Sequence, residues 1–207
     1  MKFRPTLLAL GLGIFATAAS MTAGADGNPE QGKKLAYTCL GCHGVPNYKN
    51  AYPSYSVPRL GGQHAKYIDA ALKEYAAGDR SHPTMHAQAA TLNDQDRADI
   101  GVYLHGQPLT PGEQVGTPPP AVQTCAACHG ALGSKTMTED YPVLAGQHAD
   151  YIVNALKEYK SGKRKNPVMA GIVAGLEEKD FPALALFFSQ QQGLCGSDVI
   201  TKQGKCR

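Results

Sequence analysis

The sequence predicts an all-α fold built from two similar halves in tandem. Three observations support this prediction. A C-x-x-C-H run occurs twice, at residues 39–43 and 125–129. A longer segment, residues 58–75, returns with closely related residues at 142–159. Apolar residues recur at helical spacing in both copies, and no stretch alternates strongly enough to predict a sheet.

Three helices are expected in the first half. Asn28 followed by Pro29 is typical of a helix start, and this helix leads into the first C-x-x-C-H run. The second helix ends at Gly78, a residue type favoured after a last helical turn. Its apolar stripe consists of Ile68, Leu72 and Tyr75. A third helix can be capped by Asn93 or Asp94. Its inward residues are Ile100, Tyr103 and Leu104.

The second half repeats the last two of these helices. The striped helix is expected to end at Gly162, and Pro182 is tolerated only in the first turn of the last helix. The apolar positions of the two helices are Ile152, Leu156 and Tyr159, followed by Leu184, Phe187 and Phe188.

A proline-rich segment, residues 106–120, separates the two copies and is expected to form an extended, stiff linker. We place the domain boundary near residue 112, giving a first domain at 26–112 and a second at 113–207. Halves of about 85–95 residues have marginal cores on their own. A buried cofactor would supply much of the missing apolar interior, so folding is expected to depend on its attachment.

The C-x-x-C-H runs are typical of covalent haem attachment. Two thiols three positions apart can each form a thioether with one haem vinyl group, and the adjacent histidine can bind the iron. A thioredoxin-like redox pair or a zinc site is the alternative for a single run, but two complete runs in a duplicated chain favour haem. The predicted attachment residues are Cys39, Cys42, Cys125 and Cys128, and the predicted proximal ligands are His43 and His129.

A methionine at a matching place in each copy is the predicted sixth ligand. Met85 lies 42 positions after His43, and Met169 lies 40 positions after His129. Methionine fills the open face of the iron and raises its potential, which suits an electron carrier. The alternative is that these methionines fill gaps in irregular loops. His86 competes with Met85 and is not excluded by the sequence.

The N-terminus has the pattern of an export leader. Lys2 and Arg4 precede an apolar run that ends near residue 19, and small residues up to Ala25 fit a cleavage site. Residues 1–25 are therefore expected to be removed, and the mature protein is expected in the periplasm. The apolar run is shorter than the roughly 20 residues that a spanning helix needs.

Charge excludes one class of partner. Of the 20 basic residues, 18 remain outside Lys2 and Arg4, against 17 acidic ones, so no nucleic-acid partner is expected. One basic cluster lies before Met169 and could be a solvated face or a docking site for an acidic redox partner. It consists of Lys160, Lys163, Arg164 and Lys165.

Other repeated or unmatched residues have open roles. Cys195 and Cys206 lie outside the haem runs and could pair in an oxidising compartment, closing a small loop. His64 and its counterpart His148 could hydrogen-bond near haem propionates, or simply belong to a duplicated polar helix start. Their possible partners are Gln63 and Gln147, or Tyr67 and Tyr151. Arg59 could neutralise a propionate in the first half only.

Together, these motifs resemble the di-haem cytochrome c4 family. The resemblance rests on the two C-x-x-C-H runs, the two Gly-Gln-His-Ala-x-Tyr-Ile segments and the late Pro-x-Met elements, and it covers the mature chain. It implies two tandem class I cytochrome c domains, each around one covalently bound haem c. It also implies the axial pairs His43/Met85 and His129/Met169.

The same resemblance implies one-electron transfer rather than catalysis. Expected partners are redox proteins: a quinol-oxidising complex such as bc1, a terminal oxidase or a periplasmic dehydrogenase, with peripheral association with such membrane complexes left open. Two alternatives remain. The chain could be the haem subunit of a flavocytochrome sulfide dehydrogenase or thiosulfate-oxidising complex, or a catalytic or gas-binding haem protein with an open iron.

Overall fold

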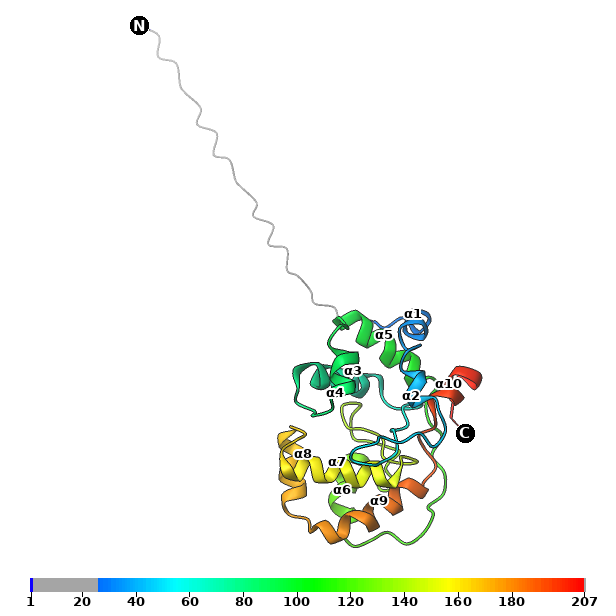
Figure 1. Ribbon diagram of the computed structural model, residues 1–207, viewed down its shortest axis with the longest axis vertical. Helices are drawn as coiled ribbons and strands as arrows, with labels where there is room; N and C mark the ends of the chain where they lie inside the picture. The colour runs from blue at the N-terminus through cyan, green and yellow to red at the C-terminus, as the bar shows by residue number, and fades with distance from the viewer. Residues whose placement is uncertain (2–25, 207) are drawn as a thin grey trace.

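A computed structural model describes Met1 and residues 26–206 of the chain. The predicted leader, apart from Met1, lies outside the described residues. The described chain forms two helical halves, one above the other in Figure 1, with no named strand among the described residues. This confirms the predicted all-α class. No helix in the described part of the chain is long and apolar enough to cross a membrane.

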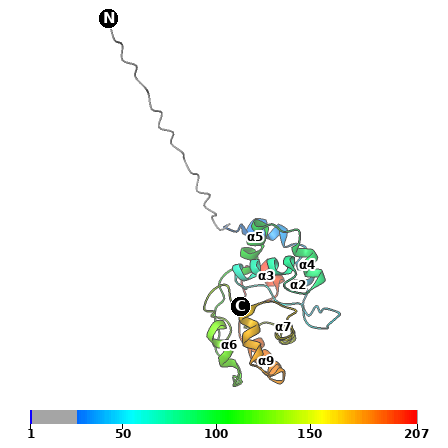
Figure 2. The ribbon, with the colours of Figure 1, turned by 90° about the vertical axis from the view of Figure 1, so that its left-hand side faces the viewer.

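Short helices build both halves. The first half contains α1 (Pro29–Leu35), α2 (Leu40–His43), α3 (Ala65–Ala77), α4 (Pro83–Ala89) and α5 (Asp94–His105). The chain continues through α6 (Val122–His129), α7 (Ala149–Ser161), α8 (Pro167–Ala174), the 3₁₀ turn η1 (Glu178–Asp180), α9 (Phe181–Gln190) and α10 (Ser197–Gln203). Figure 2 shows the same two groups of helices from the side.

The predicted helix ends follow from local chemistry. The Asn28 side chain accepts hydrogen bonds from the first turn of α1. Asn93 caps α5 and forms a reciprocal capping box with Asp96, which settles the choice that the sequence left open. Gly78 and Gly162 end α3 and α7 with φ angles of 78° and 75°, which side chains with a Cβ rarely adopt.

Each half has its own apolar core. In the first half α5 packs between α1 and α3, and in the second half α7 packs against α8 and α9. The first core consists of Ala36, Ile68, Leu72, Ala89, Ile100, Tyr103 and Leu104. The second consists of Val122, Ile152, Leu156, Tyr159, Val173, Phe181, Leu184, Ala185, Phe187 and Phe188. The apolar helix faces predicted from the sequence therefore pack into these two cores.

The C-terminal segment lies against the first half, although the sequence boundary grouped it with the second. The Tyr103 hydroxyl of α5 lies 2.9 Å from the Thr201 hydroxyl of α10. The backbone N–H of Gln107 donates to the Gly204 carbonyl at 3.1 Å. Helix α10 sits beside the first half in Figure 1. The tail thus crosses back over the molecule after α9.

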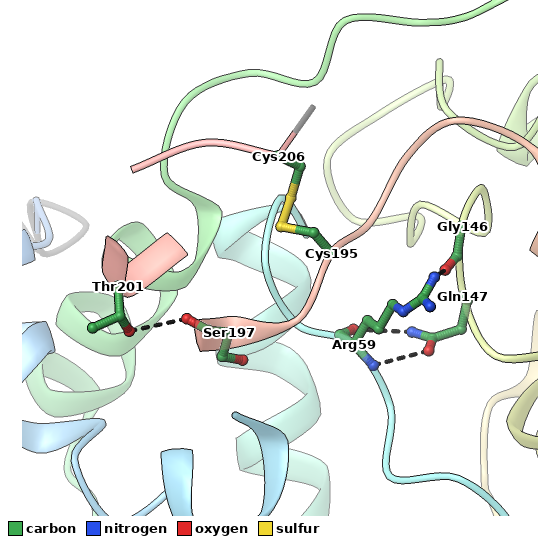
Figure 3. Close-up of a disulfide and its surroundings, with 7 residues drawn as sticks. All are labelled: Arg59, Gly146, Gln147, Cys195, Ser197, Thr201 and Cys206. Carbon is green, nitrogen blue, oxygen red and sulfur yellow. Dashed lines mark hydrogen bonds between the residues drawn. A yellow bond between two sulfur atoms is a disulfide. The ribbon is translucent and has the colours of Figure 1, made fainter. Parts of the chain in front are cut away.

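A disulfide closes this tail, as the sequence allowed. Cys195 and Cys206 are bonded, with their Cα atoms 5.5 Å apart (Figure 3). The backbone of Cys195 also exchanges two hydrogen bonds with Gly61 of the first half, at 3.0 and 3.1 Å. The disulfide loop is therefore joined to the segment that leads into α3.

Two repeated glutamines join the halves by matching contacts. Gln63 of the first half donates to the Val143 carbonyl at 3.0 Å and accepts from its N–H at 2.9 Å. Gln147 of the second half makes the same pair of contacts with Arg59, both at 2.9 Å (Figure 3). The Arg59 guanidinium donates to the Gly146 carbonyl. These side chains bridge the seam between the halves, which differs from the propionate roles considered for them.

Candidate functional site

The two C-x-x-C-H runs are carried by helices at matching places in the halves. Cys39 immediately precedes α2, which contains Cys42 and His43. The second run lies entirely within α6. Helical spacing of three residues brings both cysteines of a run to one side of the helix, and the histidine follows directly. Each run can therefore present two sulfurs and one imidazole to the same space.

That space is a cavity of about 840 Å³ that extends through both halves. Its lining is mostly apolar, as suits a flat hydrophobic cofactor. All eight residues predicted as cofactor or iron ligands line it: Cys39, Cys42, His43, Met85, Cys125, Cys128, His129 and Met169. The structure brings the predicted residues together around one continuous interior.

Each predicted proximal histidine is oriented by a backbone carbonyl. The Nδ1 atom of His43 lies 2.9 Å from the Pro58 carbonyl oxygen, and that of His129 lies 2.8 Å from the Pro142 carbonyl oxygen. Because a carbonyl can only accept, Nδ1 carries the proton and Nε2 keeps its lone pair. Burial lowers the pKa of both imidazoles, which favours the neutral form that binds metals.

Both methionines lie in short helices rather than irregular loops. Met85 is in the first turn of α4, where its N–H donates to the His82 ring at 3.3 Å. Met169 occupies the same place in α8, where its N–H donates to the Asn166 side chain at 3.0 Å. These capping residues hold the turn that carries each methionine. Sequence reasoning assigned no role to His82, whose ring accepts this capping hydrogen bond.

His86, the competitor of Met85, lies on the exposed side of α4. Its Nδ1 lies 2.9 Å from the Tyr75 carbonyl oxygen, and it is not part of the cavity lining. Since Met85 does line the cavity, the geometry favours the methionine as the ligand.

The first cysteine of each run does not resemble an activated redox thiol. Burial raises the pKa of Cys39, and it raises the pKa of Cys125 to about 11. Catalytic C-x-x-C pairs instead have a lowered thiol pKa. Within residue 1 and residues 26–206, no group of three or more His, Cys, Asp or Glu side chains is arranged to hold a metal ion. The raised thiol pKa values disfavour the redox-pair alternative to haem attachment.

The basic cluster predicted before Met169 does not form one surface. Arg164 is buried, at 3% exposure. Lys165 pairs with Asp79 of the first half at 3.1 Å, and Lys160 donates to backbone carbonyls near residue 176. Arg164 therefore cannot take part in a docking surface, whereas Lys160, Lys163 and Lys165 are exposed.

Sequence reasoning considered Tyr67 and Tyr151 near the propionates, but it did not predict that a set of polar groups lines the cavity at the seam. They are Arg80 and Arg164 with Tyr67, Tyr75, Tyr151 and Tyr159, at positions related by the repeat. The Nε atom of Arg164 is buried without a partner among the described residues. A cofactor with carboxylate groups would satisfy such a donor, so haem propionates fit the part of the cavity that lies at the seam.

These features define a class: a helical two-site haem protein of the c type, with one attachment run per half. The family model for cytochrome c matches the chain twice, at residues 29–107 and 121–191. The chain belongs to the cytochrome c family, within its di-haem cytochrome c4 group.

The chain is similar to two cytochromes c4, which support this membership, and to a protein with another name. Cytochrome c4 of Thiocapsa roseopersicina is 31% identical over 186 residues, covering 81% of this chain and 93% of the relative. The crystal structure of reduced recombinant cytochrome c4 from Pseudomonas stutzeri has a TM-score of 0.61 at 28% identity, covering 82% of this chain and 100% of that chain. A thiosulfate dehydrogenase electron acceptor of Stutzerimonas stutzeri is 29% identical over 201 residues, covering 86% of this chain and 92% of the relative. The chain carries two covalently bound haem c groups and is a di-haem electron carrier with redox partners.

Proposed function

We propose that each half holds its haem with the residues predicted from the sequence. Cys39 and Cys42 would attach the first haem, and Cys125 and Cys128 the second. His43 with Met85, and His129 with Met169, would be the axial pairs. The observation that carries this proposal is that all eight side chains line the same cavity.

The chain's own groups prepare these sites for electron transfer. When bound, each haem supplies a one-electron iron couple whose potential its axial ligands set. The carbonyls of Pro58 and Pro142 hold the imidazole proton away from the iron side. The caps His82 and Asn166 hold the methionine turns in place. With His43 and Met85, and His129 and Met169, as ligands on both faces, neither iron would have a coordination position open to a substrate, which would suit a carrier rather than an enzyme.

The proposed physiological role is transfer in the periplasm, from a quinol-oxidising complex such as bc1 toward a terminal oxidase. The leader pattern and the family membership support this role, and covalent haem attachment requires a compartment outside the bacterial cytoplasm. A second role is transfer from a thiosulfate dehydrogenase, which the similarity to an electron acceptor of that enzyme favours.

A redox titration followed by optical spectra tests the axial pairs. We expect two one-electron transitions, a methionine–iron band in both oxidised haems, and no carbon monoxide binding to the reduced protein. Met85→Ala and Met169→Ala should each remove one band and open one iron to carbon monoxide. Carbon monoxide binding by the unsubstituted protein, or an unchanged spectrum in either variant, would contradict the proposal.

The two roles are separated by the donor that reduces the protein. The oxidised holoprotein would be mixed with quinol and a bc1 complex, or with thiosulfate and a thiosulfate dehydrogenase. Faster reduction by the first system supports the respiratory role, and faster reduction by the second supports the alternative.

A further inference from the structure

Two arginines lie buried at matching positions of the repeat, where the halves meet. Arg80 is 4% exposed and Arg164 is 3% exposed. Their backbones form an antiparallel bridge between the halves, and both side chains line the cavity. A guanidinium stays charged in proteins, so each buried arginine requires a compensating partner.

Tyrosine hydroxyls supply neutral partners. The Nη2 atom of Arg164 donates to the Tyr67 hydroxyl of the other half at 2.8 Å, and its Nη1 donates to the Tyr151 hydroxyl at 3.3 Å. Arg80 also donates to Tyr67, at 3.3 Å. Because Tyr67 is buried against two guanidiniums, their charges lower its pKa despite the opposing effect of burial. The tyrosines accept hydrogen bonds but do not balance two positive charges.

The carboxylates that could balance them are arranged unequally. Glu74 forms an ion pair with Arg80. Its counterpart Glu158 instead accepts from Asn154 at 2.7 Å, a residue whose place in the first half is taken by Ala70.

Arg164 therefore differs from Arg80. Among the residues that the structure describes, no carboxylate lies within ion-pair distance of Arg164. Its Nε also lacks an acceptor there. A buried cation with a free donor at a cavity wall points to an anionic group of the bound ligand.

We propose that Arg164 binds a haem propionate carboxylate, and that Glu74 offsets Arg80, so that the seam presents unequal positive charge to the two haems. A positive charge near a haem favours its reduced form, because reduction removes a positive charge from the iron. Arg164 is then a positioning residue that raises the potential of the haem whose carboxylate it binds. This inference rests on the haem sites proposed above.

Redox titration of the holoprotein tests the proposal. Arg164→Gln should lower one midpoint potential, by at least a threefold change in the reduction equilibrium, or about 28 mV for one electron. Glu74→Gln frees Arg80 and should raise one potential by a comparable factor. Glu158→Gln is the matched control, because this carboxylate contacts Asn154 rather than an arginine. In Glu158→Gln, both midpoint potentials should change by less than the shift expected for Arg164→Gln.

Vibrational spectra distinguish binding of a propionate by Arg164 from a purely structural role of Arg164 between the two halves. The propionate bands in resonance Raman spectra should shift in Arg164→Gln and, less strongly, in Arg164→Lys, which keeps the charge but has no Nε–H. They should not shift in Glu158→Gln. Unchanged potentials and propionate bands in Arg164→Gln would overturn the proposal.

If Arg164→Gln does not form a holoprotein, the comparison of the midpoint potentials of Glu74→Gln and Glu158→Gln tests the proposal instead. Equal potentials in these two variants would also overturn the proposal. The methionine–iron band and carbon monoxide binding, measured on the same samples, report separately whether the proposed axial ligands hold.

Discussion

At the scale of single residues, backbone contacts determine how the predicted ligands are presented. A carbonyl fixes the proton of His43 on Nδ1, and an equivalent carbonyl does so for His129. The repeat keeps this contact although the residues between histidine and proline differ in number. Both copies therefore keep the hydrogen bond between the histidine Nδ1 and the proline carbonyl, although the loop between the two residues differs in length.

The helix caps of the methionine turns give a residue-scale prediction. Asn166→Ala should lower the free energy of unfolding by about 1 kcal/mol, because the N–H of Met169 loses its acceptor. His82→Ala should have a similar effect in the first half. In both variants the methionine–iron band should disappear at a lower temperature. Lys163→Ala, an exposed substitution near the second cap, is the control. Equal band stability in control and cap variants would contradict the prediction.

A second residue-scale prediction concerns pH. Burial lowers the pKa of His64 and His148 in the folded protein. Histidine in the unfolded chain takes up a proton at about pH 6.5. Below that pH the unfolded chain binds more protons than the folded protein, so the free energy of unfolding falls.

We expect the free energy of unfolding, measured with denaturant, to decrease between about pH 7.5 and about pH 5.5. The decrease should be smaller in His64→Gln and in His148→Gln, and smallest in the double variant. An unchanged pH dependence in the double variant would show that other groups dominate.

At the scale of helices, local signals predicted some elements and missed others. The cap of α5 and the terminal glycines of α3 and α7 were predictable because the residues that satisfy helix ends are neighbours in sequence. Helices α4 and α8 were missed because each is short and is held by packing at the edge of a core. Helix α10 was missed because its partners, such as Tyr103, are distant in sequence.

The disulfide gives a prediction for α10. Replacing Cys195 and Cys206 together with serine should lower the free energy of unfolding by about 3 kcal/mol, because the short loop gains freedom mainly in the unfolded chain. Hydrogen exchange in α10 should become faster, whereas exchange in α7 should change little. Unchanged protection of α10 would mean that its contacts with the first half hold the tail without the disulfide.

At the scale of the whole molecule, the duplication accounts for the seam. Residues at equivalent positions meet across it: Gln63 with the second half, Gln147 with the first, and Arg80 beside Arg164. The sequence showed that these residues recur, and the eight residues that it predicted as ligands all line the cavity. It did not show that a repeated glutamine contacts the other copy, because a repeat by itself carries no information about how the copies pack.

The matching glutamine contacts give a prediction for the whole molecule. Gln63→Ala would leave the buried N–H and carbonyl of Val143 without partners, which costs about 1–3 kcal/mol. Gln147→Ala should cost a similar amount, since it removes the equivalent contacts with Arg59. We expect the double variant to unfold in two steps, because the halves lose their reciprocal contacts while each keeps its own core.

The measurement is denaturant unfolding followed separately at each haem. Gln203→Ala, an exposed substitution in α10, is the control and should unfold like the unsubstituted protein. If only one glutamine variant is destabilised, the equivalence of the two contacts is wrong and the seam depends on one half. If neither is destabilised, the arginine and tail contacts hold the halves together, and the glutamines only follow from the duplication.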